Sequence, residues 1–513
     1  MFEVKAWLYA IVFLVIGLLG FRYCVDRRLN TGIGKNFLPL MAITQLAAFV
    51  SPTVLIYNSI VAIAMVVGCQ KRDQIAPTYL FLLVTLPLPS KVISTGSTYL
   101  MAYDASISLA LGGMAALMMH PGGRPQRSVA NDVPIYAFLL LLAFINARST
   151  TATNLLRVLL DLTSTILLPY LLVSRAVRSA QDFRFAIYGL VAGMAALSTL
   201  AIYEALHMWP LYRIVADHYG IYLGGDANVK VRAGLLRSPG PFTEPTSFGY
   251  CLAIGMIAAI LSRNLFRSST LYLGFLGVLC LGILAPQSRG AWLGVIVGIV
   301  GREIYDGRWA SLSKKVAIGA IAGLAIVTAG KLDSRIASTA GLNAEGQGTV
   351  EYRSNLLTRG LEEIRAHPVI GRPPDVVRAA LRDMTQGEGI VDFVNTYLFI
   401  GLTSGVIGFV IFVLIFLTPC GALLKARSTP FLRLAFRRGQ DPTAGLVFGT
   451  LLGIMSMIAV TSMTGRTTIF VAIEIGFASA ILNFVYSRQA MPRQRAAATV
   501  DTQASAAMPV PGA

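Results

Sequence analysis

The sequence predicts an all-α polytopic membrane protein, a bundle of about 12–15 transmembrane helices. Three observations support this fold class. The chain has 513 residues, of which 55% are hydrophobic and only 13% are charged. Apolar runs recur from one end of the chain to the other, and basic residues gather in the short loops between them. Soluble domains do not combine these features, so the bilayer is the expected environment.

The individual spans follow from the length of the apolar runs. A helix needs roughly 20 mostly apolar residues to cross the hydrocarbon core. About fifteen segments approach this criterion: 6–21, 36–52, 54–69, 77–94, 105–120, 133–146, 155–174, 183–205, 245–262, 269–286, 290–304, 315–330, 393–424, 442–463 and 466–486. The first is followed by arginines rather than by a small-residue cleavage site, so we expect a retained span and not a signal peptide.

The distribution of charge predicts the orientation of these spans. Lys and Arg are concentrated in alternate short loops, namely 22–35, 70–75, 121–130, 175–182, 263–267, 302–315 and 425–440. By the positive-inside rule these loops face the cytoplasm, and loops 206–244, 286–289 and 331–392 face outward. An odd number of spans would place the amino terminus outside. The net charge of +18 therefore reflects membrane orientation, and we expect no nucleic-acid partner.

The chain divides into a transmembrane bundle over 1–486, a cap of helices over 331–392 within it, and a tail over 487–513. In the cap, Leu356, Leu357, Leu361 and Ile364 lie on one face of a predicted helix over 351–365. Pro368 ends that helix, and a second helical stretch is expected over 375–384. The tail is rich in Ala, Pro and Gln, which predicts a disordered cytoplasmic segment.

Common nucleotide, metal and hydrolase signatures are missing from the sequence. No Walker loop, HExxH or GxSxG motif occurs. The five cysteines are scattered without metal-ligand spacing, and the outer loop 95–104 carries only one acid, Asp104. We therefore predict no metal site and no cofactor, and expect arginine electrostatics to take the place of a metal.

Arginines at the predicted outer membrane face are the main candidates for substrate binding. The loop before Glu244 ends in a cationic stretch that includes Arg232 and Arg237, and Arg289 lies in a short outer turn followed by small residues. A guanidinium stays charged at physiological pH, and its planar group can donate two parallel hydrogen bonds to one phosphate. These three residues predict a site for a lipid pyrophosphate. The alternative is that they are interface anchors whose heads reach lipid phosphates.

Three further polar residues lie close to the predicted membrane surface. Glu244 precedes Pro245, and the favoured interpretation is an amino-terminal helix cap. Asp392 and Asn395, at i and i+3, are expected to share one face of a helix where the large loop re-enters the membrane. Asp392 is then either a general base for a sugar hydroxyl or another helix cap.

Four motifs occur in an order that resembles a known family. They are Arg232…Arg237-Ser-Pro-Gly-Pro-Phe…Glu-Pro…Phe-Gly249, Gln-Ser-Arg289-Gly-Ala, Tyr-Arg353…His367-Pro-Val-Ile-Gly371 and Asp392…Asn395-Thr-Tyr-Leu…Gly405…Gly408. Together they resemble the O-antigen ligase and Wzy-type polysaccharide polymerase superfamily. The resemblance covers residues 230 to 410.

The resemblance implies a metal-independent, inverting glycosyltransferase of the C-type membrane fold. Such an enzyme acts at the periplasmic face of the bacterial inner membrane, on glycans linked to undecaprenyl pyrophosphate. The family's pyrophosphate-binding arginines correspond to Arg289 and to Arg232 or Arg237, and the shared motif adds Arg353. Lipid-linked glycan as donor and acceptor, the lipid bilayer and a chain-length regulator are the expected partners.

One departure from the family pattern bears on the reaction. Ligases carry a His-Asn pair after the large loop, whereas here Val394 precedes Asn395 and the nearest ionisable residue is Asp392. This favours a polymerase of exopolysaccharide or O-antigen, with Asp392, Asn395 and Glu244 as catalytic candidates. The first alternative is a ligase that transfers glycan to lipid A core. The second is a flippase or exporter, which should have charges inside several spans and pseudo-repeated halves; the sequence has neither, although Arg157 and Asp161 lie in one apolar segment as a candidate buried pair. The third is a non-enzymatic scaffold.

Overall fold

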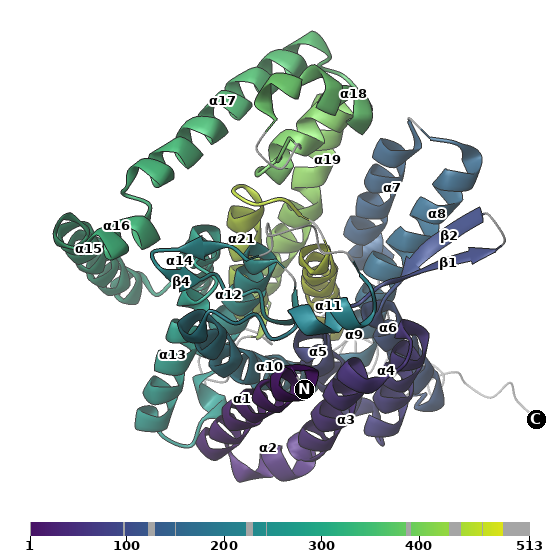
Figure 1. Cartoon of the computed structure of the whole chain (residues 1–513), viewed down its shortest axis with the longest axis vertical. Coiled ribbons are helices and arrows are strands. Elements are labelled where there is room, and N and C mark those ends of the chain that lie inside the picture. Colours follow the sequence, from purple (N-terminus) through teal and green to yellow (C-terminus); the bar gives the residue numbers. More distant parts are fainter. Residues whose placement is uncertain are drawn as a thin grey trace, which may run out of the picture.

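The computed structural model describes residues 2–95, 98–121, 129–148, 150–221, 229–242, 244–385, 391–429, 443–463 and 465–485. Within these ranges the chain is a bundle of helices with two short antiparallel hairpins (Figure 1). The predicted disordered tail, 487–513, lies outside the described residues.

Helices of the first half surround α10 and α5. The elements are α1 (Phe2–Cys24), α2 (Arg27–Gly32), α3 (Phe37–Val50), α4 (Val54–Gly68), α5 (Ile75–Thr85), β1 (Lys91–Thr95), β2 (Thr98–Tyr103), α6 (Ala105–Met119), α7 (Val133–Ala147), α8 (Ala152–Leu162), α9 (Leu168–Ala176) and α10 (Ala180–His207). Every residue of α5 is buried, and α10 is 83% buried over its most apolar stretch. These two helices form the centre of the bundle.

The second half supplies the remaining bundle helices and the cap. Its elements are α11 (Arg213–His218), β3 (Val231–Arg232), β4 (Leu235–Leu236), α12 (Pro245–Leu261), α13 (Ser269–Leu284), α14 (Arg289–Asp306), α15 (Trp309–Leu332), α16 (Ser334–Ala340), α17 (Ala344–Ala366), α18 (Pro374–Ala380), α19 (Thr396–Arg427), α21 (Thr443–Ile458) and a final helix over Arg466–Val485. In Figure 1, α16, α17 and α18 arch over one end of the bundle.

The predicted class of all-α polytopic membrane protein is confirmed. Among the described residues, seven helices are long and apolar enough to cross a membrane, and five shorter apolar helices of 10–17 residues accompany them. The total of 12–15 spans stays a prediction. The predicted helices of the cap region are present too, because 351–365 lies within α17 and 375–384 is covered by α18 and a turn of 3-10 helix over Arg382–Met384.

Two predicted spans have different boundaries from those expected. The segment 77–94 does not continue as a helix beyond Thr85, and Lys91–Thr95 forms a hairpin with Thr98–Tyr103 instead. Pro87 and Pro89 explain the early end, since proline cannot donate the backbone hydrogen bonds that a helix interior needs. The segment 393–424 begins its helix only at Thr396.

Glycines allow the closest approach of helices in the second half. A Cβ added at Gly449 of α21 would lie 2.5 Å from the backbone oxygen of Gly298 on α14, and one at Gly453 would lie 2.8 Å from that of Gly294. Small residues at such positions bring helix backbones together in a membrane, where packing replaces the hydrophobic effect. This contact fixes the position of the amino terminus of α14, which carries Arg289.

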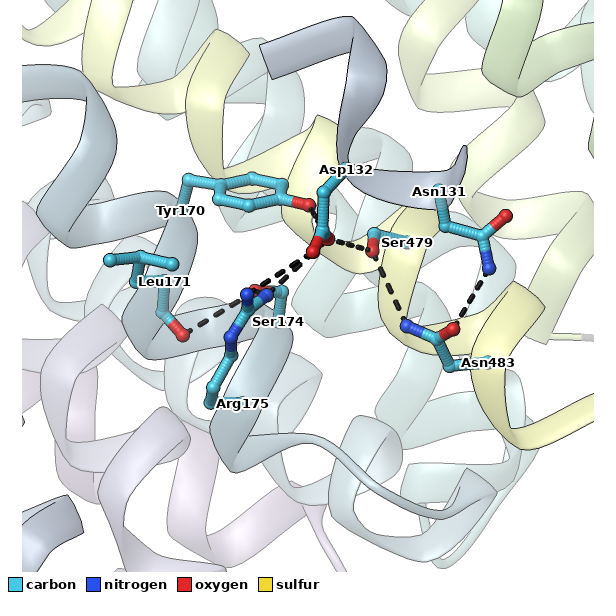
Figure 2. Close-up of polar contacts among 8 residues, drawn as sticks. All are labelled: Asn131, Asp132, Tyr170, Leu171, Ser174, Arg175, Ser479 and Asn483. Carbon is cyan, nitrogen blue, oxygen red and sulfur yellow. Dashed lines mark hydrogen bonds and ion pairs between the residues drawn. The ribbon is translucent and has the colours of Figure 1, made fainter. Parts of the chain in front are cut away.

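A buried polar cluster joins α7 and α9 to the final helix (Figure 2). The Asp132 carboxylate accepts hydrogen bonds from the hydroxyls of Tyr170 and of Ser479, the latter at 3.1 Å, and pairs with Arg175 at 3.2 Å. Asn483 continues the network by donating to Ser479 at 3.5 Å. A buried carboxylate needs such partners to offset its desolvation, so the cluster holds the final helix in one register against α7 and α9.

The cap is anchored to α19 by a small core of its own. Leu356 of α17 and Val377 and Leu381 near α18 are buried together with Phe393, Leu398 and Leu402, separately from the main core. This contact sets the position of α17 relative to the start of α19.

The helix α19 is broken at Gly405, and backbone groups of the cap make hydrogen bonds to α19 at the break. Gly405 has φ +64°, and the Val406 N–H donates to the Pro368 carbonyl at 2.8 Å instead of continuing the helix ladder. Arg372 N–H donates to the Leu402 carbonyl at 2.9 Å. Only glycine fits here, because a Cβ at Gly405 would lie 2.4 Å from the Val369 oxygen.

Arg148, at the end of α7, stabilises this contact between the cap and α19. Its guanidinium donates to the carbonyls of Ile370, of Thr403 at 2.7 Å and of Gly371 at 2.8 Å. One side chain thus bonds both the loop of the cap and the last turn before the break. We call the segment 368–372, Gly405 and Arg148 the cap joint.

Candidate functional site

A cationic cleft of about 490 Å³ lies between the cap and the bundle. Its walls come from the β3–β4 hairpin, the amino termini of α12 and α14, the start of α17, and the loops around 392 and 460. The charged residues that line it are Lys230, Arg232, Arg237, Arg289, Arg353, Glu244 and Asp392. The cleft therefore brings together six of the seven predicted site residues, and Asn395 is the one that it leaves out.

The β3–β4 hairpin is attached to the turn that precedes α14. Arg232 Nη1 donates to the Gln287 carbonyl at 3.3 Å, and Gln287 Nε2 donates back to the Arg232 carbonyl at 3.2 Å. Arg237 Nε donates to the Pro286 carbonyl at 3.1 Å. These bonds place Arg232 and Arg237, both far from Arg289 in sequence, on the wall of the same cleft.

Arg289 begins α14 and packs against the cap. Ser288 is the residue at the N-cap position, and the helix dipole adds positive potential at this end of an 18-residue helix. The guanidinium lies directly over Gly341, where an added Cβ would overlap it. Gly341 has φ +79° and ends α16. Arg289 therefore lies where the bundle, the cap and the cleft meet.

Arg353 completes the cationic wall from the side of the cap. Its Nη2 donates to the Val460 carbonyl at 3.3 Å. Although the residue as a whole stays exposed, desolvation of the guanidinium lowers the pKa of Arg353 from its ordinary value, while Asp392 raises this pKa and Arg232 lowers it. Arg232 and Arg353 thus repel each other across the cleft, and a bound anion would relieve that repulsion.

Asp392 lies in a loop and not in a helix. Its Oδ1 accepts from the Ser462 hydroxyl at 3.4 Å, and its backbone carbonyl accepts from the Tyr352 hydroxyl at 3.2 Å. Burial and the Asp392 charge raise the pKa of Tyr352 from its ordinary value. Asp392 lines the cationic cleft and also borders a second cavity of about 410 Å³.

The expected helical pairing of Asp392 with Asn395 is wrong, because α19 begins only after both residues. Asn395 is the N-cap of α19, and its Oδ1 accepts from the Leu398 N–H at 3.2 Å. It lines a separate, apolar groove of about 260 Å³ between α17 and α19. The cap interpretation therefore holds for Asn395 and not for Asp392.

Glu244 stands at the N-cap position of α12, but the expected capping hydrogen bond is not made. Its side chain accepts no backbone N–H of the helix, and it accepts from the Ser247 hydroxyl at 3.1 Å. Pro245 occupies the first turn, as expected. Its exposed carboxylate instead lines the cationic cleft.

Two buried charged residues position the loop that joins Arg237 to Glu244, and neither was predicted from the sequence. Glu204 of α10 is fully buried and accepts from the Leu211 N–H at 2.9 Å, the Ser238 hydroxyl at 2.6 Å and the Gly240 N–H at 3.0 Å. Arg466 donates to the carbonyls of Leu86 and of Pro241, the latter at 3.1 Å.

The Arg466 guanidinium also lies 4.0 Å from the centre of the Phe242 ring, a cation–π contact. Ionisable residues inside apolar helices are rare and signal a functional role. That signal was available in the sequence for both Glu204 and Arg466.

A larger cavity, of about 780 Å³, lies at the other end of α12, beside Ser262. It is lined by Arg28 and Arg184 together with Asp26. None of the predicted site residues borders it, so the cationic cleft remains the candidate site on the strength of its chemistry rather than its size.

Comparison with known proteins places part of this site in a family. Residues 273–413 match the family model described as O-antigen ligase. The match includes Arg289, Arg353, Asp392 and Asn395, and it begins after Arg232, Arg237 and Glu244. No curated protein matches the chain. The resemblance to O-antigen ligases and Wzy-type polymerases is thereby confirmed, and the chain is a polytopic membrane protein of which residues 273–413 match the O-antigen ligase family model.

Proposed function

We propose that this protein polymerises oligosaccharide repeat units linked to undecaprenyl pyrophosphate into exopolysaccharide or O-antigen. One observation carries the proposal: four arginines and a lysine from three separate segments line one cleft together with Asp392. The five cations outnumber the two carboxylates, Glu244 and Asp392, that line the same cleft. A pyrophosphate group would supply the missing negative charge.

The arginines suit the bond that breaks in this reaction. When the anomeric carbon leaves its phosphate oxygen, negative charge accumulates on the departing undecaprenyl pyrophosphate. Guanidinium groups held in fixed positions stabilise charge that develops in a transition state. Each charge-assisted hydrogen bond contributes about 1.5–3 kcal/mol, so two or three of them support the departure of the lipid pyrophosphate without a metal ion or another cofactor.

The proposed transfer step needs only the two substrates and one carboxylate. The acceptor hydroxyl oxygen attacks the anomeric carbon from the side opposite the pyrophosphate, which inverts that centre. The bond from the carbon to the phosphate oxygen breaks, and its electron pair leaves with undecaprenyl pyrophosphate. Asp392 takes the proton of the acceptor hydroxyl as general base.

The family acts on lipid-linked glycans within a membrane, and we extend this to a specific location. The cleft lies at the end of the bundle that the positive-inside pattern directs to the periplasm. We therefore assign the reaction to the periplasmic face of the bacterial inner membrane. A chain-length regulator is a further proposed partner.

Ligation of glycan to lipid A core is the second candidate, because the matching family model is described as O-antigen ligase. Against it, Val394 stands where ligases have the histidine of their His-Asn pair. Asn395 also lies in a different groove from the arginines.

An exporter receives less support. Arg157, expected as one of its membrane charges, lies with its guanidinium 5.0 Å from the centre of the Tyr99 ring. It makes no ion pair with Asp161 among the residues that the structure describes.

Complementation of a deletion strain separates these functions. A polymerase mutant retains single repeat units on lipid and loses long chains, whereas a ligase mutant makes long chains that do not reach lipid A. We expect the first phenotype, restored by the wild-type gene. Normal chain length in the deletion strain would refute the polymerase.

A further inference from the structure

Asp392 borders two cavities of opposite chemical character. On one side lies the cationic cleft. On the other lies the second cavity, of about 410 Å³, whose walls include Leu142 of α7, Phe393, and Phe399 and Ile400 of α19. We call it the apolar cavity. Its volume falls in the range of about 300–1,000 Å³ that is typical of small-molecule sites.

The polar residues that line the apolar cavity are few: Arg378, Asp392, Thr396 and Ser462. The Ser462 hydroxyl donates to the Phe393 carbonyl at 2.6 Å and to Asp392 at 3.4 Å. Arg378 of α18 supplies the one cation among the residues that line it. Within the part of the chain that the structure describes, Arg378 has no hydrogen-bond or ion-pair partner.

This lining is unsuited to pyrophosphate and well suited to a sugar. Two negative phosphates would meet a single guanidinium beside a carboxylate. A pyranose ring, by contrast, presents apolar C–H faces to aromatic side chains and hydroxyls to a few placed polar groups. The rings of Phe393 and Phe399, which line the cavity together with Asp392, lie 5.3 Å apart, centre to centre.

We propose that the apolar cavity binds the terminal, non-reducing sugar of the acceptor glycan. The accepting hydroxyl then lies at the Asp392 carboxylate, and Arg378 donates to a hydroxyl or an acidic substituent of that sugar. The inference rests on the proposed function and adds the acceptor subsite to it. It also explains why only one of the two cavities is strongly cationic, since the pyrophosphate of the acceptor is remote from its non-reducing end.

The test uses purified full-length protein in nanodiscs, with the lipid-linked repeat unit isolated from the deletion strain as donor. The acceptor probe is the same oligosaccharide without its lipid. Arg378→Ala should raise the KM for this acceptor about tenfold or more, because a charge-assisted hydrogen bond is lost. Inhibition by added undecaprenyl pyrophosphate should stay unchanged.

Two other variants complete the comparison. Leu142→Trp places a large side chain in the apolar cavity and should block the acceptor while leaving inhibition by undecaprenyl pyrophosphate intact. Arg365→Ala is the matched control, because Arg365 is an exposed arginine of the cap that borders neither cavity. It should behave as wild type.

The outcomes separate this inference from the proposed function. If the wild-type protein elongates the acceptor and both Arg378→Ala and Leu142→Trp keep the wild-type KM, the acceptor subsite is refuted and the polymerase stands. If the wild-type protein transfers no sugar from an intact donor, the proposed function itself fails.

Discussion

Replacing Asp392 with Asn tests the proposed chemistry most directly, because the structure predicts a large catalytic effect and a small structural one. Asp392 does not cap α19, since Asn395 does. Its contacts with Tyr352 and Val394 use its backbone carbonyl, which the substitution leaves in place. Its side chain accepts from the Ser462 hydroxyl at 3.4 Å, and an amide oxygen can accept this hydrogen bond equally well.

The expected effects of Asp392→Asn on stability and on reaction rate differ enough to be distinguished. A single retained or weakened hydrogen bond changes stability by about 1 kcal/mol or less. Loss of a general base lowers the rate by about 100- to 10,000-fold, which corresponds to about 2.7–5.4 kcal/mol of transition-state free energy. We therefore expect Asp392→Asn to abolish polymer at an unchanged protein level.

The assay combines polymer length on gels with rates from purified protein. Asp375→Asn is the matched control, because Asp375 is an exposed acid of the cap that lines neither the cationic cleft nor the apolar cavity. A fall of only about twofold for Asp392→Asn would remove Asp392 as the base. Glu244→Gln would then be the next variant, since Glu244 is the other carboxylate of the cleft.

Three further predictions follow from the site. Arg289→Lys should lose most activity although the charge is kept, because an ammonium cannot form the two parallel hydrogen bonds that a planar guanidinium makes to a phosphate. If Arg289→Ala still made wild-type polymer, Arg289 would be only a membrane anchor. Glu204→Gln replaces a carboxylate oxygen that accepts a hydrogen bond with an N–H₂ group that faces the hydrogen-bond donor. The free energy of unfolding should fall by about 1–3 kcal/mol, and binding of the glycan donor should weaken more than binding of the glycan acceptor in kinetic assays. Equal effects on both substrates would contradict a role confined to the Arg237–Glu244 loop. Alkaline phosphatase fused after residue 360 should be active and after residue 310 inactive, and the reverse result would invert the topology.

The parts of the fold that were predictable are those that depend on local composition. Apolar runs predicted the membrane class, and the spacing of Leu357, Leu361 and Ile364 predicted the helix that became α17. The grouping of Arg232 with Arg289 was also accessible, because both follow from charge at the ends of predicted spans. Their meeting in one cleft depends on the bonds to Gln287.

The parts that were missed depend on contacts between distant segments. The break in α19 requires the Pro368 segment and Arg148, which lies more than 200 residues away from it. A single glycine in an apolar run carries no such information. Asn395 was placed beside Asp392 because both were assumed to be helical, and the start of α19 at Thr396 overturned this.

The cap joint has a mechanical consequence for the site. Hydrogen bonds from Val406, Arg372 and Arg148 tie the cap to α19 on both sides of the break at Gly405. The short length of α19 before the break carries Asp392 just ahead of its first turn, and the same length packs in the core of the cap. The carboxylate of Asp392 is therefore held by the same contacts that join the cap to α19, and a substitution that loosens the cap joint should also disturb the position of Asp392.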